Sequence, residues 1–254
     1  MSHAERVLAY GSFEALRCLR SRQYLFLAIA LPAGLYVATL AAGTGGPGGT
    51  PADGATRSAA SLAAFATLGA LGAGLVAGGS RLAAERDGGW LRTLSLAALP
   101  RFHMLAGRVL AGIIAAVLSI AVVVGAGAVG MGLTVPGAGF APGRWLALAV
   151  SLWAGAVPFA LLGVVVGLTL GRRVAVVAVL ILYVGLAVGG GLLEPGGSLP
   201  ADLATMERVL PSFVADDLGW RVLLGEGLSA RDIALLAAES LALGSFLAWT
   251  RRRP

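Results

Sequence analysis

Charged side chains that could pair with a partner gather in one stretch of this chain, residues 81–101. Only 13% of all residues are charged, and long apolar segments flank this stretch on both sides. Its acidic and basic residues are interleaved: Arg81, Glu85, Arg86, Asp87, Arg92 and Arg101. We interpret the stretch as the cytosolic portion of a polytopic membrane protein, exposed to whatever binds there.

The residue types in the chain argue against several kinds of chemistry. It contains no lysine, which excludes a Walker A lysine, a Schiff base and a lysine general base. His3 and His103 lie far apart and Cys18 is the single cysteine, so we expect no disulfide and no metal site. We therefore expect no catalytic residue, no bound cofactor and no enzyme activity in this chain. Any ATP must be bound by another protein.

Composition points to a bilayer as the solvent. The chain has 254 residues, 57% of them hydrophobic, and a mean hydropathy of +0.86. Soluble domains carry about 45–50% apolar and about 25% charged residues. We expect one all-α transmembrane domain covering residues 1–254, surrounded by membrane lipids and without a nucleic-acid partner.

Six apolar segments are long enough to cross about 30 Å of hydrocarbon at 1.5 Å per residue. They cover residues 24–42, 59–80, 105–132, 145–170, 174–193 and 233–250. Pro32 is expected to kink the first of them. Gly74 and Gly78 in the second permit close helix packing. Residues 81–104 then form a cytosolic loop, and residues 194–232 a long outer loop.

Arginine distribution gives the orientation. Of the 19 arginines, 14 fall on the side that holds residues 1–22, the 81–104 loop, Arg108, Arg172-Arg173 and Arg251–Arg253. We therefore expect a multi-pass protein of the bacterial cytoplasmic membrane with both termini in the cytoplasm. Its first 22 residues predict either an interfacial helix, with Arg6, Arg17 and Arg20 among headgroups, or an ordinary cytosolic lead-in.

Within the cytosolic loop, residues 90–99 can form a separate short helix. Gly88-Gly89 breaks the preceding helix and Pro100 closes this one. An apolar stripe runs along it: Trp90, Leu91, Leu94 and Ala98. Such a helix suits a groove on a partner protein, but it suits the membrane surface equally well.

The order of these motifs resembles the membrane subunits of type-2 ABC exporters, the ABC-2-type permease family. The similar residues are Glu85-Arg86, Gly89-Trp90-Leu91, Leu94, Leu99-Pro100 and Gly107-Arg108-Val109-Leu110-Ala111. Leu210-Pro211-Ser212-Phe213 is similar to the proline-led outer segment of that family. Departures are Leu99-Pro100-Arg101-Phe102 and the arginine in Gly107-Arg108, where the family more often has other residues.

The resemblance implies a division of labour. A separate ABC ATPase, binding ATP and Mg²⁺, would push on a coupling helix around Trp90–Leu99, with Glu85 and Arg86 as its charged lead-in. Residues 1–22 would be the connecting helix, and Pro211 and Phe213 would belong to an outer gate. Two permease subunits, as a homodimer or a heterodimer, would pair around the export path. The uncharged spans suit a hydrophobic or amphiphilic cargo, such as a drug, antibiotic or lipid-like molecule.

Two further segments leave alternatives open. The apolar and acidic residues of 194–232 predict either short re-entrant helices in the outer leaflet or an amphipathic loop on the surface. Glu239 lies within the sixth span, where a carboxylate costs about 2.5 kcal/mol or more to insert. It would contact a cationic cargo or a proton, or it would bond a hydroxyl of a neighbouring helix. Rival functions are a secondary transporter, a lipid-active membrane enzyme and a membrane scaffold without an ATPase.

Overall fold

The computed structural model describes residues 3–41, 51–88, 101–135, 138–193 and 207–250. Among these residues, six helices are long and apolar enough to cross a membrane. They cover Arg22–Ala41, Thr56–Asp87, His103–Met131, Pro142–Thr169, Arg172–Gly189 and Ala230–Trp249. The protein is thus a largely helical, multi-pass membrane protein, as the sequence predicts.

The first half of the chain forms three continuous helical stretches. They are α1 (His3–Leu19), then α2 (Arg22–Tyr24) with η1 (Leu25–Ala30) and α3 (Leu31–Ala41), then α4 (Pro51–Leu75) with η2 (Val76–Ser80) and α5 (Arg81–Asp87). The elements η1 and η2 are short π-helical turns inside otherwise α-helical spans.

The second half contains the remaining spans and one small hairpin. Its elements are α7 (Arg101–Met131), β1 (Thr134–Val135), β2 (Gly139–Phe140), α8 (Pro142–Thr169), α9 (Arg172–Gly189), α11 (Pro211–Leu224) and α12 (Ala230–Thr250). The antiparallel hairpin β1–β2 follows Gly132 and Leu133, both with positive φ. No pattern in the sequence predicts these two short strands.

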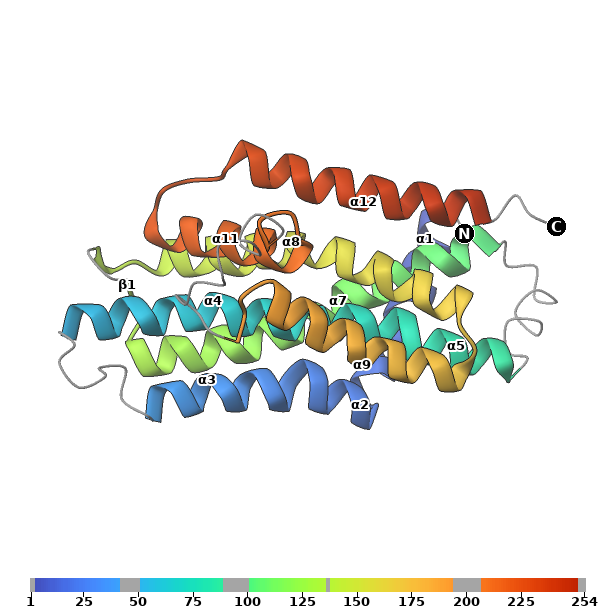
Figure 1. The fold of residues 1–254 in the computed structure, drawn as a ribbon, viewed down its shortest axis with the longest axis horizontal. Coiled ribbons are helices and arrows are strands. Elements are labelled where there is room, and N and C mark those ends of the chain that lie inside the picture. The colour runs from blue at the N-terminus through green and yellow to red at the C-terminus, as the bar shows by residue number, and fades with distance from the viewer. Residues whose placement is uncertain (1–2, 42–50, 89–100, 136–137, 194–206, 251–254) are drawn as a thin grey trace.

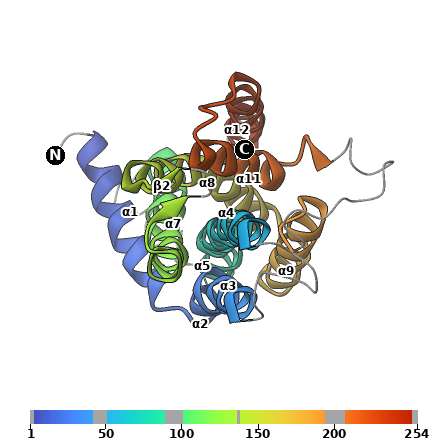
Figure 2. The same cartoon turned by 90° about the vertical axis from the view of Figure 1, so that its left-hand side faces the viewer.

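Helix α4 is the centre of the bundle. The spans run side by side along the long axis of the molecule (Figure 1), and the end view places α4 and α5 inside a ring of the other helices (Figure 2). The most apolar stretch of the α4 span is 94% buried, against 11% for α12. Small residues permit this burial, because Ala and Gly fill most of the sequence from residue 59 to 79.

Glycines let α4 and η2 approach α8 closely. A Cβ at Gly78 would lie 2.4 Å from the Val164 nitrogen, and a Cβ at Gly163 would lie 2.4 Å from the Gly74 oxygen. A Cβ at Gly167 would lie 2.3 Å from the Gly78 oxygen. The predicted role of Gly74 and Gly78 in close packing is therefore confirmed, with Gly163 and Gly167 as their partners.

The turn η1 accommodates Pro32 without a sharp break. Proline has no N–H, so the carbonyl four residues earlier, that of Ala28, loses its helical partner. The Ser119 hydroxyl of α7 donates to that carbonyl. The neighbouring Leu27 carbonyl accepts from the Tyr183 hydroxyl of α9 at 2.9 Å. Side chains of two other helices thus satisfy the backbone that the π-turn releases.

Several boundaries differ from the predicted ones. The second span continues as helix to Asp87, and Gly88 caps it, so the predicted break at Gly88 is confirmed. Helix α7 begins at Arg101. The segment predicted as a cytosolic loop, residues 81–104, is therefore helical at both ends, because Arg81, Glu85, Arg86 and Arg108 have partners there.

Helix α11 lies in the segment predicted to form outer re-entrant helices. It has 14 residues, about 21 Å, and is too short to cross a bilayer. It packs between α8 and α12 (Figure 2), burying Val214, Leu218 and Leu223. Arg144 of α8 donates to the Leu224 carbonyl at 2.8 Å and so stabilises its carboxyl end. The other half of the predicted pair falls on residues 194–206, outside the described chain.

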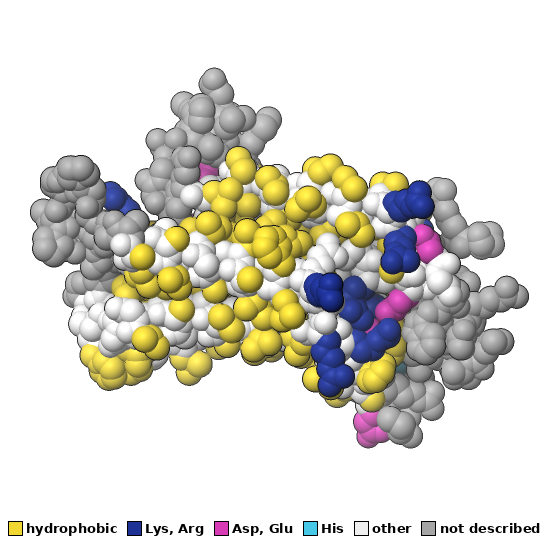
Figure 3. All heavy atoms as spheres, turned by 90° about the horizontal axis from the view of Figure 1, so that it is seen from below, with side chains coloured by type: hydrophobic (Ala, Val, Ile, Leu, Met, Phe, Trp, Pro, Cys, Tyr) yellow, Lys and Arg dark blue, Asp and Glu magenta, His cyan; other side chains and the backbone are white. Residues whose placement is uncertain are grey.

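Arginines gather at one end of the molecule. In Figure 3 their side chains cluster near one end, whereas the rest of the visible surface is mostly apolar or uncharged. Helix α1 and the last turn of α12 lie at this same end (Figure 1). The turn between α8 and α9, with Arg172 at its exit, also lies there.

Candidate functional site

The most distinctive polar feature of the described chain is where α1 meets α5 and α7. Helix α1 turns a stripe of small residues and one acid toward the bundle: Gly11, Glu14, Ala15 and Cys18. A Cβ at Gly107 of α7 would lie 2.4 Å from the Tyr10 ring, so the two helices are in close contact. One arginine, Arg108, and two acids, Glu14 and Glu85, meet where these helices pack together.

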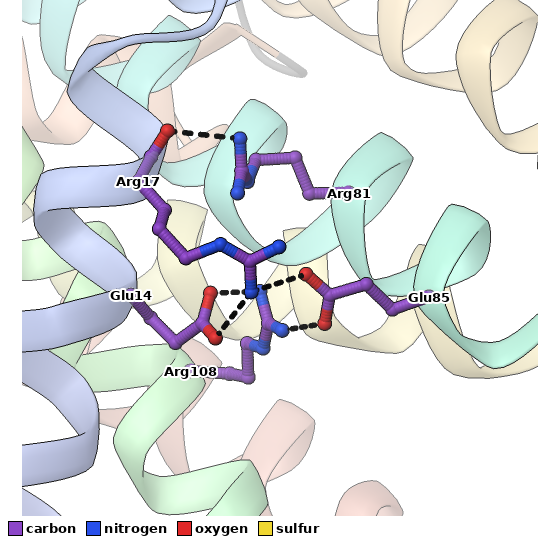
Figure 4. Close-up of polar contacts among 5 residues, drawn as sticks. All are labelled: Glu14, Arg17, Arg81, Glu85 and Arg108. Carbon is purple, nitrogen blue, oxygen red and sulfur yellow. Dashed lines mark hydrogen bonds and ion pairs between the residues drawn. The ribbon is translucent and has the colours of Figure 1, made fainter. Parts of the chain in front are cut away.

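Arg108 of α7 lies between two carboxylates. Its Nη1 is 3.1 Å from Glu14 Oε2, and its Nη2 bonds Glu85 Oε2 of α5. The Arg108 and Glu14 side chains are 2% and 1% exposed. Figure 4 shows the guanidinium held between the two acids, which come from different helices. One arginine thus joins three segments that are far apart in the sequence.

Arg17 and Arg81 complete the group. Arg17 Nη1 is 3.0 Å from Glu14 Oε1 and 3.4 Å from Glu85 Oε1. Arg81 Nη1 donates to the Arg17 backbone oxygen at 3.0 Å. We call these residues the ionic junction: Glu14, Arg17, Arg81, Glu85 and Arg108.

Charge pairing explains how Glu14 and Arg108 can be buried in the ionic junction. Three guanidinium groups meet two carboxylates, so its formal charge is +1. Buried charges are tolerated when they are paired and hydrogen-bonded, and each one left alone costs several kcal/mol. The Arg108 guanidinium also lies 5.9 Å from the centre of the Tyr10 ring. The arrangement suits rigid attachment of α1 and α5 to α7.

Cys18 lies on the face of α1 that packs on the bundle and is chemically quiet. It is 1% exposed. Burial raises the pKa of its thiol to about 11, although Arg81 and Arg108 favour the thiolate. The thiol therefore stays protonated at neutral pH and is a poor nucleophile.

Arg86 and Asp87, the two residues after Glu85, bind α8 and α9 on the opposite side of the bundle. Arg86 donates to the Leu168 carbonyl and, at 2.9 Å, to the Leu170 carbonyl, both at the end of α8. Asp87 Oδ2 accepts the Arg172 backbone N–H at 2.8 Å, where α9 begins. The residues that lead into segment 89–100 are thus connected to α1, α7, α8 and α9.

Only part of the predicted coupling site falls on described residues. Glu85 and Arg86 lie there, with the partners given above. Trp90, Leu91, Leu94, Leu99 and Pro100 lie outside the described residues. Arg20 is exposed and Arg17 is half-buried in the ionic junction. Arg6 lies in α1, and its side chain is not among those described.

Burial on α1 divides its residues into two faces. Glu14 is buried, while Leu8, Phe13 and Leu16 are 56–59% exposed. Arg108 of α7 is buried as well, because Glu14 and Arg108 neutralise each other inside the protein. The interfacial position of α1 stays a prediction.

The predicted outer gate residues occupy the start of α11. Pro211 is the first residue of the helix and Phe213 is half-buried. Ser212 donates to the Leu186 carbonyl of α9 at 2.7 Å. Asp216 is a neighbouring acid that the sequence does not single out, and its Oδ1 is buried with no hydrogen-bond partner among the described residues. Burial, followed by the charge of Asp217, raises the pKa of Asp216 to about 8.

Glu239 lies on α12 and is half-buried. Its Oε2 is buried and finds no hydrogen-bond partner in the described part of the chain. The predicted hydroxyl partner on a neighbouring helix is therefore absent from the described contacts. Among the same residues, no group of three or more His, Cys, Asp or Glu side chains is arranged to hold a metal ion.

Comparison with known proteins identifies a transport protein as a relative. No family model matches the chain. A protein of Bacillus subtilis (strain 168), named "Putative transport permease YvfS", is 27% identical over 185 residues, which is 72% of this chain and 73% of that protein. The similarity covers most of both chains and supports a role as a transport permease for this protein.

Proposed function

We propose that this chain is the permease subunit of an ATP-driven exporter of the type-2 ABC class. A separate ATPase subunit binds the end of the bundle that carries the ionic junction and hydrolyses ATP with Mg²⁺. This chain contributes the membrane path and no catalytic residue. A second permease subunit, identical or related, completes that path.

The observation that supports the proposal most strongly is the attachment of residues 85–87. Glu85 binds Arg108 of α7 and Arg17 of α1, Arg86 binds the end of α8, and Asp87 binds the start of α9. One residue, Gly88, separates them from segment 89–100, which contains the predicted coupling helix of residues 90–99. Force applied to that segment by an ATPase reaches four helices through a few stiff polar contacts.

Orientation and energy source agree with this arrangement. Arginines concentrate at the junction end of the bundle (Figure 3), which the positive-inside rule assigns to the cytoplasm. The chain has no lysine to hold a nucleotide phosphate. Both termini are then cytoplasmic, in the cytoplasmic membrane of a bacterium.

The cargo is a hydrophobic or amphiphilic molecule. The spans are rich in Ala, Gly, Val and Leu. Few polar groups are therefore available within the membrane to replace the hydration shell of a hydrophilic cargo.

Affinity purification in a mild detergent tests the proposal. The intact chain should retain an ABC ATPase, and Trp90→Ala combined with Leu94→Ala should release it. Phe140→Ala combined with Leu241→Ala is the matched control, because both side chains are exposed and apolar, 69% and 73%, and lie elsewhere. If no ATPase accompanies the intact, folded chain, the proposal is wrong.

A secondary transporter is the second candidate, and Glu239 is the observation that favours it. Glu239 is half-buried, and its Oε2 has no hydrogen-bond partner among the described residues; a carboxylate within a membrane span can carry a proton. Glu239→Gln should then abolish transport that persists without ATP. Under the ABC proposal, transport without ATP is absent in both the variant and the unmodified protein.

A further inference from the structure

An apolar cavity lies between four helices on one side of the bundle. It measures about 480 Å³, within the range of small-ligand sites. Its ten lining residues come from α1, α7, α8 and α12 and are all Val, Leu, Ile, Ala or Gly. In the end view of Figure 2, α1 and α12 lie at the periphery of the bundle, and α7 and α8 lie between them. No lining side chain offers a hydrogen-bond donor or acceptor.

The cavity lies at one depth, near the junction end of the spans. On α7 it begins at Leu105, four residues into the helix, and reaches Ile113, about 18 Å from the start of the helix. On α12 it takes in Gly244 to Ala248, within the last seven residues of the helix. It therefore lies in one half of a hydrocarbon layer about 30 Å thick.

Helix α12 is the weakly held wall of this cavity. Only 11% of its most apolar stretch is buried. Near its carboxyl end, Leu247 is the buried anchor, packed in a small cluster with Leu82 and Val164. Space is left over beside that anchor, because a Cβ added at Gly244 would meet no atom within 4 Å.

Charge at the depth of the cavity indicates which molecule fits. Exposed arginines gather at the junction end of the bundle, where the cavity also lies (Figure 3). Arg20, at the end of α1, and Arg172 and Arg173, at the start of α9, are among them. An arginine at the membrane surface attracts anionic headgroups, by about 1 kcal/mol for each such residue. An apolar cavity at the positively charged end of the spans matches an anionic phospholipid.

We propose that this cavity binds one acyl chain of an anionic phospholipid, which fills the space between α7 and α12. Filling an apolar void restores the dispersion contacts that its lining otherwise lacks. The bound chain thereby holds the end of α12 against the bundle. The lipid comes from the leaflet on the junction side, which the proposed function identifies as the inner one; nothing else in the inference depends on that function.

Photolabelling tests the inference without any ATPase. The intact chain is reconstituted in phosphatidylcholine–phosphatidylglycerol vesicles with a trace of phosphatidylglycerol that carries a diazirine on one acyl chain. After illumination, adducts should concentrate on residues 105–113 and 244–248. They should exceed, several-fold, those on the exposed α9 side chains Val177 and Ile181. Even labelling of all exposed apolar faces would mean ordinary surrounding lipid and would refute the inference.

Two variants sharpen the result. Gly244→Leu should reduce the cavity adducts several-fold by filling the space. Gly125→Leu is its matched control, because a Cβ at Gly125 also meets nothing within 4 Å but lies outside the cavity. Equal adducts in Gly244→Leu and in the unmodified chain would refute the site.

A second labelled lipid and one competing molecule identify the occupant. Phosphatidylcholine with the same diazirine chain should label the cavity less, and equal labelling would contradict the anionic preference. Excess rhodamine 6G, a hydrophobic cation, should leave the adducts in place. If it removes them, the cavity is a cargo site and the lipid proposal is wrong. A negative result in either arm leaves the ATPase proposal untouched, because purification with an ATPase does not depend on this cavity.

Discussion

Arg108 has the largest side chain among the fully buried residues of the described chain, and its charge depends on Glu14 and Glu85. Replacing Arg108 with Met leaves both acids buried with less compensation. We expect Arg108→Met to lower the free energy of unfolding by about 3–5 kcal/mol. Unfolding in detergent, followed by tryptophan fluorescence, measures the change. Arg20→Met is the control, since Arg20 is exposed and should matter little.

A double-mutant cycle separates the ion pair from packing. If the Glu14–Arg108 contact is an energetic unit, Glu14→Gln combined with Arg108→Met should cost less than the two single changes added together. If the double variant loses as much stability as the two single variants added together, Glu14 and Arg108 do not interact energetically.

Asp216 predicts a pH dependence of stability. Its pKa is raised to about 8 in the folded protein from an ordinary 3.8. The folded state therefore binds a proton that the unfolded state releases between about pH 4 and pH 8. The free energy of unfolding should fall as pH rises through this range and level off above pH 8. Asp216→Asn should flatten the curve, and an unchanged slope in that variant would assign the dependence to another group.

Glu14 and Arg108 also mark the limit of what the sequence predicts about the site. They are 94 positions apart, and pattern alone places a charged residue in water or headgroups. One signal was present, because Glu14 shares a helical stripe with Gly11, Ala15 and Cys18, all small. A carboxylate within a stripe of small residues indicates a close partner of opposite charge. The sequence did identify Glu85 and Arg86, since they stand out against an apolar background.

At the scale of elements, the glycine contact of α4 and η2 with α8 should tolerate no added atoms. A Cβ at Gly78 would lie 2.4 Å from a backbone nitrogen, which cannot move aside as a flexible side chain can. We expect Gly78→Ala to cost about 1–3 kcal/mol, the usual range for overpacking. Gly34→Ala is the matched control, because its Cβ meets nothing within 4 Å. Equal free energies of unfolding for the two variants would contradict the close packing at Gly78.

The π-turn η1 gives a second prediction at this scale. Ser119→Ala and Tyr183→Phe each remove a hydroxyl that satisfies a carbonyl of η1. Hydrogen bonds between membrane helices average about 0.6 kcal/mol, so each variant should lose about that much stability. Equilibrium unfolding in detergent or mixed micelles is sensitive enough to detect it. A loss of several kcal/mol would mean that packing, rather than the hydrogen bond, is the main contribution.

The spans themselves could be predicted because length and hydropathy determine them almost alone. Pro32 indicated a disturbance in the first span, but the π-turn that absorbs it depends on Ser119 and Tyr183 of other helices. Helix α11 was predicted only as a choice between two structures. Its burial is decided by neighbours, and local sequence does not name them. The hairpin β1–β2 left no pattern, because two strands of two residues have no periodicity.

At the scale of the whole molecule, the bundle has a fixed core and a loosely held edge. Helices α1, α5 and α7 are joined by the ionic junction, and α4 and η2 contact α8 through their glycines. Helix α12 lies at the periphery (Figure 2). A protein that moves a cargo needs both a part that transmits force and a part that yields. We assign the first role to the junction end of α5 and α7.

Contact between this chain and an ATPase is the central claim, and site-specific crosslinking in native membranes tests it most directly. The single cysteine is first removed by Cys18→Ala, and a photoreactive maleimide is attached at Leu94→Cys. We predict a covalent adduct that contains an ABC ATPase, whereas the same probe at Phe140→Cys, in the β2 strand, should give none. An adduct without an ATPase at position 94, or equal ATPase adducts at both positions, would contradict the account.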